Sequence, residues 1–107
     1  MTIHRLDLDV AIYRDRVQVT HRATQTFVDQ RATYGFSSDA SIVADPRYLE
    51  HTIVRAIGKV LSANGFEIRE PIASVVRCET PLTDAEKAIV ERALIGAGMH
   101  NVRFEIG

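Results

Sequence analysis

The feature that most constrains the fold is an alternation of apolar and polar residues from His4 to Tyr13. One side of this stretch is apolar and the other is mainly polar. Alternation with a period of two is typical of a strand with one face in the core and the other toward water. The apolar set is Leu6, Leu8, Val10 and Ile12, and the opposite set is Arg5, Asp7, Asp9 and Ala11.

Two more strands are predicted directly after this one. Residues 14–16 (Arg-Asp-Arg) form a polar break suited to a tight turn, and residues 17–22 then alternate again, which indicates a hairpin. A third strand is expected from Gln25 to about Ala32, because Thr26, Phe27 and Val28 favour extended backbone. The chain therefore opens with three consecutive strands.

Helices and strands alternate in the second half. Asp45 and Pro46 form an N-cap and a first helical residue, and the apolar spacing after them predicts a helix of about 17 residues closed at residues 64–65 (Asn-Gly). A strand is expected from Ile72 to Cys78. The spacing of Thr83 and Glu86 is that of a capping box and predicts a second helix, which Gly98 would end.

A last strand is expected over Val102, Phe104 and Ile106, so the order is βββαβαβ within a single domain, residues 1–107. The connection from Thr33 to Ala44 is the only place for a mobile loop. Because nearly every strand is amphipathic, we expect a two-layer α/β sandwich with a mixed sheet, both helices on one face and the other face open. The open face would present Arg5, Asp7, Asp9, Arg103 and Glu105 as an interaction face.

Charge and cysteine content exclude several classes of function. Thirteen basic and fourteen acidic residues give a net charge of −1, which lacks the field that nucleic acid or an anionic membrane requires. No apolar run is long enough to span a membrane. The N-terminus has acidic residues where a signal peptide would be apolar, and the single cysteine, Cys78, permits no internal disulfide. These features predict a cytoplasmic protein, and no cofactor is expected.

The C-terminal half resembles the MreB-type rod-shape-determining bacterial actins, which have the ribonuclease H-like fold. The matching segments are residues 42–45 (Ile-Val-Ala-Asp) before a helix, the strand at 73–77, residues 83–90 (Thr-Asp-Ala-Glu-Lys-Ala-Ile-Val), and residues 96–102 (Gly-Ala-Gly-Met-His-Asn-Val). The resemblance covers about 65 residues. It implies an actin-like, ribonuclease H-like subdomain, and a link to cell shape and the cytoskeleton.

The N-terminal half departs from that family at its phosphate-binding turn. Residues 7–10 read Asp-Leu-Asp-Val where actin-like ATPases have Asp-Leu-Gly-Thr, so Asp9 places a negative charge where a phosphate would lie. The chain also lacks the family's second domain and the helix after the last strand. We therefore expect a truncated subdomain without nucleotide binding that acts by protein interaction, as a homodimer or with an actin-like or cell-shape protein.

The same topology offers an enzymatic alternative. Ribonuclease H-like nucleases hold two magnesium ions with carboxylates on the first strand, the first helix and the end of the fourth strand. Asp7, Asp9, Glu50 and Glu79 occupy comparable positions. This pattern suggests a divalent-metal phosphodiesterase, although no basic patch accompanies it and helix starts favour carboxylates in any case.

The remaining chemically active residues favour structural roles. The four histidines (His4, His21, His51 and His100) are isolated in the sequence and are expected at the surface or at strand ends, with no metal-binding spacing. Cys78 ends an apolar strand and is expected to be a buried thiol, not a nucleophile.

Overall fold

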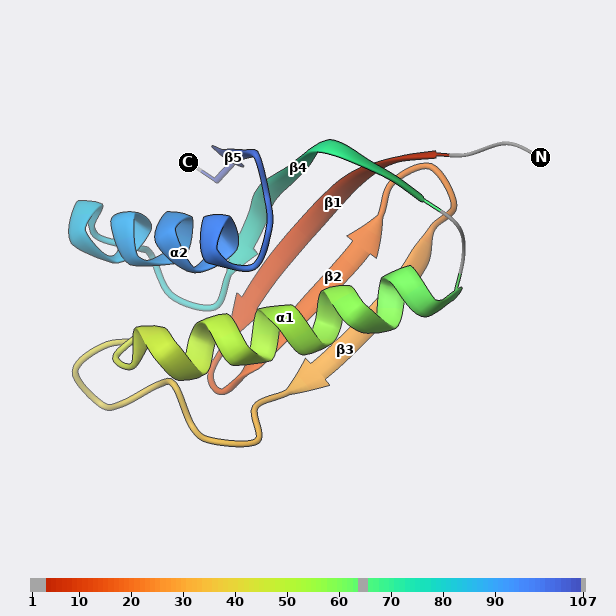
Figure 1. Cartoon of the computed structure of the whole chain (residues 1–107). Coiled ribbons are helices and arrows are strands. Elements are labelled where there is room, and N and C mark those ends of the chain that lie inside the picture. Colours follow the sequence, from red (N-terminus) through yellow and green to blue (C-terminus); the bar gives the residue numbers. More distant parts are fainter. Residues whose placement is uncertain (1–3, 64–65, 107) are drawn as a thin grey trace.

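We describe residues 4–63 and 66–106 of a computed structural model of the chain. Figure 1 shows a compact α+β domain, which confirms the predicted combination of one mixed sheet with two helices. Its elements are β1 (His4–Tyr13), β2 (Arg16–His21), β3 (Thr26–Arg31), α1 (Pro46–Ala63), β4 (Phe66–Cys78), α2 (Asp84–Gly96) and β5 (Asn101–Phe104). No helix within the described ranges is long and apolar enough to cross a membrane.

The five-stranded sheet has the order β3-β2-β1-β4-β5. Short turns join β1 to β2 and β2 to β3, so these pairs are antiparallel. The crossovers through α1 and α2 make β1 parallel to β4 and β4 parallel to β5, because a parallel neighbour needs a long connection. β1 is therefore the central strand, and its side chains define the two faces of the sheet.

Both helices lie on one face of the sheet, with α1 across β2 and β3 and α2 beside α1 near β5 (Figure 1). The apolar side of β1 faces them, and Leu8, Val10 and Ile12 are fully buried there. Ile53 and Val60 of α1 and Val90 and Leu94 of α2 complete this core. Among the described residues no helix covers the opposite side of the sheet, where every second side chain of β1 points.

The predicted helix starts are confirmed in atomic detail. Oδ1 of Asp45 accepts hydrogen bonds from the backbone N–H groups of Arg47 and Tyr48 at 3.0 and 3.2 Å. The hydroxyl of Thr83 accepts from the N–H of Glu86 at 3.1 Å, and the Glu86 carboxylate accepts from the N–H of Thr83 at 2.9 Å. Each helix therefore begins where its cap satisfies free amides.

Of the two predicted helix ends, only that of α2 lies within the described residues. Gly98 has a φ of +110°, a conformation that glycine adopts readily, and it follows the last turn of α2 as predicted. The expected end of α1 at residues 64–65 lies outside the described residues.

The predicted start of the fourth strand is wrong. β4 begins at Phe66, not at Ile72, and it contains an irregularity before Pro71: Arg5 is opposite Glu67, whereas Asp7 is opposite Ile72. Glu70 has a φ of +51° at this point. A proline is tolerated in a strand at such a bulge, because the sheet hydrogen bond it cannot donate is already interrupted there. β5 in turn ends at Phe104, before Ile106.

The connection between β3 and α1, which the sequence marks as a place for a mobile loop, is anchored in the core. Phe36 is 0% exposed, and Ile42 and Val43 are buried with it. Ser37 donates its backbone N–H to Oδ1 of Asp15 at 2.8 Å, and its hydroxyl accepts from the N–H of Asp15 at 3.0 Å. The β1–β2 turn therefore holds the connection in place.

Candidate functional site

The most elaborate polar cluster is centred on Arg22, which directly follows β2. Its backbone N–H donates to the carbonyl of Asp7 at 3.1 Å, extending the pairing of β2 with β1 by one residue. Its side chain then donates from Nε to Oδ1 of Asp9 at 2.6 Å and from Nη2 to Oε2 of Glu105 at 3.1 Å. Arg22 thus links β1, the end of β2 and the segment after β5.

Three carboxylates surround this single guanidinium. Oδ1 of Asp7 lies 4.0 Å from Nε of Arg22, beyond hydrogen-bond distance but within reach of its charge. The hydrogen bond that Arg22 donates to the Asp9 carboxylate is the main cause that raises the pKa of Arg22, and Glu105 and Asp7 add to it. All four side chains remain about one third to one half exposed, so solvent screens these ion pairs.

We call the uncovered side of the sheet around this cluster the open face, defined by Arg5, Asp7, Asp9, Arg22, Arg103 and Glu105. Asp7, Asp9 and Glu105 meet at Arg22. Arg5 instead pairs with Glu70 on β4, with a distance of 3.5 Å from Nη2 to Oε2. Arg103 is exposed on β5. The structure therefore places the predicted interaction residues on one surface but brings only three of them together.

Arg22 is the residue that sequence reasoning missed as a member of this site. The alternation along residues 17–22 places it on the polar side of the second strand, which is the available signal. Its three acidic partners are 13 to 83 positions away in the sequence, and only the strand order brings them near.

The middle of the open face contains two buried oxygen atoms without a hydrogen-bond partner in the described part of the chain, Oδ1 of Asp7 and Oγ of Ser74. Ser74 lies opposite Asp9 on one side and opposite Arg103 on the other. An unsatisfied buried oxygen is costly, so these two atoms lower the stability of this part of the sheet.

The four carboxylates of the enzymatic alternative do not converge. Asp7 and Asp9 lie on the open face, whereas Glu50 is on α1 in the helix layer and lies against Gly96 of α2. Glu79 follows β4, where its backbone N–H donates to the carbonyl of Ile12 at 2.8 Å. Across residues 4–63 and 66–106 no three His, Cys, Asp or Glu side chains form a group that could hold a metal ion.

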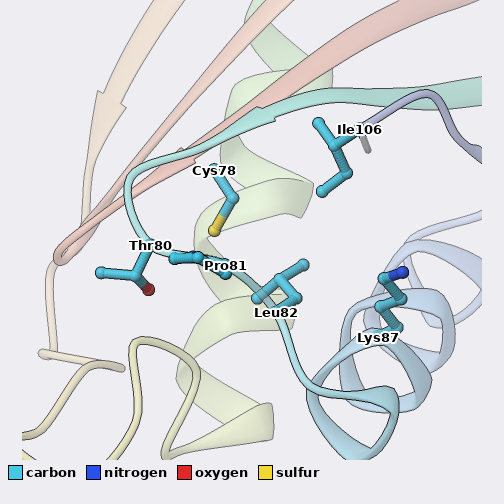
Figure 2. Close-up of a pocket in the computed structure, with 6 residues that line it drawn as sticks. All are labelled: Cys78, Thr80, Pro81, Leu82, Lys87 and Ile106. Carbon is cyan, nitrogen blue, oxygen red and sulfur yellow. The ribbon is translucent and has the colours of Figure 1, made fainter.

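A cavity of about 230 Å³ lies between the end of β4, the start of α2 and the segment after β5. Figure 2 shows the residues that line it. The sulfur of Cys78 points toward Pro81 and Leu82, and Lys87 and Ile106 line the other side. The sequence predicts a buried thiol, but Cys78 is only partly buried. Burial raises the pKa of the thiol, so the thiolate needed for nucleophilic chemistry is disfavoured.

His21 lies at a strand end, as the sequence predicts for an isolated histidine, but it is fully buried there. It is 0% exposed at the end of β2, whereas His51 and His100 are exposed. Its Nε2 lies 2.9 Å from the carbonyl oxygen of Arg5, and its Nδ1 lies 2.8 Å from Oγ1 of Thr24. Both ring nitrogens therefore have partners in the fold, which is the arrangement of a structural histidine.

No model of a known protein family matches this chain, and no curated protein matches it. Function therefore has to be inferred from the geometry of the sheet surface and of the cavity.

Proposed function

We propose that the protein is a non-catalytic self-association module that uses the open face and the adjoining edge of its sheet. The observation that carries the proposal is the composition of the open face. It has three arginines and three carboxylates (Arg5, Arg22 and Arg103 with Asp7, Asp9 and Glu105) and no covering helix within the described residues. A surface with both signs of charge can match a second copy of itself, whereas a surface of one sign repels its copy.

A ribonuclease H-like topology, of the kind that builds one subdomain of an MreB-type actin, is part of this proposal. It is supported by the strand order β3-β2-β1-β4-β5 with an antiparallel first half and parallel β4 and β5. It is also supported by the capped start of α2 at Thr83, within a segment that resembles that family. An actin-like or cell-shape protein as an additional partner rests on this resemblance alone.

The backbone around Asp9 supports the part of the proposal that the chain does not bind a nucleotide. A phosphate-binding turn needs free N–H groups directed at the phosphate. Asp9 instead lies within β1, opposite Thr20 of β2 and Ser74 of β4. The pairing of this segment on both sides commits its amides to the sheet, and the aspartate side chain adds a negative charge.

Sedimentation equilibrium over a wide range of protein concentration tests the proposal. The expected result is a monomer–dimer equilibrium that weakens at high salt, because the surface charges are screened. A titration with a fluorescent ATP analogue and magnesium is expected to show no binding. A chain that stays monomeric at the highest concentration, or that binds the nucleotide, would overturn the proposal.

A further inference from the structure

The outer edge of β3 pairs with no other strand within residues 4–63 and 66–106, so β3 is an edge strand. β3 is six residues long and β5, at the other edge, only four. Ala32 donates its backbone N–H to the carbonyl of Asp15 at 2.9 Å, and bonded pairs alternate along an antiparallel ladder. The N–H and C=O groups of Phe27, Asp29 and Arg31 therefore point outward from the sheet.

The side chains of these same three residues lie on the same side of the sheet as the open face. Phe27 is opposite Thr20, which is itself opposite Asp9. Phe27 is 57% exposed, and Asp29 and Arg31 are also exposed. An aromatic ring, an acid and a base therefore alternate along an unpaired edge, and the acid and the base are two residues apart.

We propose that β3 pairs antiparallel with β3 of a second copy of this chain, with the two-fold axis at Gln30. The inference rests on the proposed self-association and locates it. In this register Asp29 of each copy faces Arg31 of the other, so two opposite-charge pairs form across the axis. The outward N–H and C=O groups of these residues form the new ladder, which joins two sheets into one.

Neighbouring registers lack this match. An axis at Asp29 places the two Asp29 carboxylates opposite each other, and an axis at Arg31 does the same with two guanidinium groups. An axis at Val28 places Phe27 opposite Asp29. Like charges directly across a ladder are destabilising, so the charge pattern of β3 selects the axis at Gln30.

Gln30 gives a second, independent reason for this axis. It is 6% exposed, and its Oε1 has no hydrogen-bond partner in the described part of the chain. Its Nε2 donates to the outward-pointing carbonyl of Arg31 at 2.8 Å, so the side-chain amide lies at the edge itself. With the axis at Gln30 the two side-chain amides face each other. Each Nε2 can then leave the Arg31 carbonyl, which joins the new ladder, and donate to the unpartnered Oε1 of the second copy.

The decisive variant is Arg31→Asp. Within one copy Arg31 lies opposite Arg16, so this change replaces a like-charge pair by an opposite-charge pair and should not lower the stability of the monomer. Across the axis it creates two acid–acid pairs, and the dissociation constant of the dimer should rise about tenfold. If Arg31 had only a structural role, the variant that weakens the dimer would also lower the stability of the monomer.

A mixing experiment then tests the register. Asp29→Arg alone should also weaken the homodimer, because it creates two base–base pairs. An equal mixture of the Asp29→Arg and Arg31→Asp variants should form a heterodimer, visible by native mass spectrometry, since every cross-axis pair is again of opposite sign. Asp29 also lies 3.5 Å from Arg16 of its own copy, so Asp29→Arg alone removes an ion pair within the monomer. The double variant Asp29→Arg/Arg31→Asp is therefore measured as well. It should regain the homodimer, because each cross-axis pair is again of opposite sign.

The outcomes separate the two proposals. Arg92→Asp, at an exposed position of α2 in the helix layer and outside both β3 and the open face, is the control and should leave the dimer unchanged. If the wild-type chain dimerises but the β3 variants dimerise equally well, the β3 register is wrong and self-association stands. If the wild-type chain never dimerises, self-association itself fails, and the register fails with it.

Discussion

Nε of Arg22 lies 2.6 Å from Oδ1 of Asp9, and this contact crosses from the end of β2 to the middle of β1. The same guanidinium reaches Glu105 after β5, on the far side of β4. One side chain therefore connects both ends of the chain across the open face. Since each ion pair is partly exposed, the contribution of Arg22 to stability should be modest and dependent on salt.

Arg22→Ala is expected to lower the free energy of unfolding by about 1 kcal/mol, because it leaves Asp7, Asp9 and Glu105 without their shared cation. Urea unfolding at low protein concentration measures this change without a contribution from association. The loss should shrink at high salt. Arg103→Ala is the control, since Arg103 is exposed on the same face, and equal losses for the two variants would contradict the role assigned to Arg22.

Glu86→Gln should change how stability depends on pH. The hydroxyl of Ser41 donates to the Glu86 carboxylate at 2.6 Å and, with the amide of Thr83, lowers the pKa of Glu86 below its ordinary 4.5. The folded state thus favours the ionised form. Its contribution is present above pH 4.5 and is lost as pH falls through the lower folded pKa.

The measurement is the free energy of unfolding of wild type and Glu86→Gln across this acidic range. The difference between them should narrow as the pH falls below about 4.5. Thr83→Ala removes the other half of the capping box and should cost about 1 kcal/mol at neutral pH. A constant difference at every pH would mean that the charge of Glu86 does not contribute.

Cys78 should react slowly with thiol reagents. Desolvation raises its pKa above the ordinary 9.0, so the folded protein holds less thiolate at pH 8 than the unfolded chain does. Folding thus favours the protonated thiol, and this contribution is present below pH 9.0 and is lost as the pH rises through the folded pKa. The rate of reaction with a disulfide reagent, compared with that in denaturant, is the test. Reaction as fast in the folded state would contradict the burial of the thiol.

Phe36→Ala should be among the most destabilising single substitutions. The side chain is 0% exposed, and its removal leaves a cavity that typically costs about 3–5 kcal/mol. Tyr34→Ala, two residues earlier, is the control, because Tyr34 is 57% exposed and contacts Tyr48 at the surface. Thermal unfolding compares them. Similar losses would mean that the connection before α1 is not anchored through Phe36.

Local patterns were sufficient for most of the secondary structure. The alternation in β1 and the caps at Asp45 and Thr83 predict those elements because strand pleat and helix capping depend on residues close in sequence. The sequence predicts the start of β4 too late, because a proline such as Pro71 is typical of a strand boundary. The bulge that accommodates Pro71 inside the strand cannot be recognised from the sequence. The acidic partners of Arg22 could not be predicted from sequence spacing, because the order of the strands in the sheet decides which residues become neighbours.

The sequence by itself determined that nearly every strand has an apolar side and a polar side, and hence that this chain folds as amphipathic strands covered by helices. Only the tertiary structure decided that β1 lies between β2 and β4, which places Asp7, Asp9 and Glu105 around Arg22 and leaves β3 at an edge. The physical reason is that burial follows a local period, whereas charge pairing and free edges depend on strand order, which long-range packing selects.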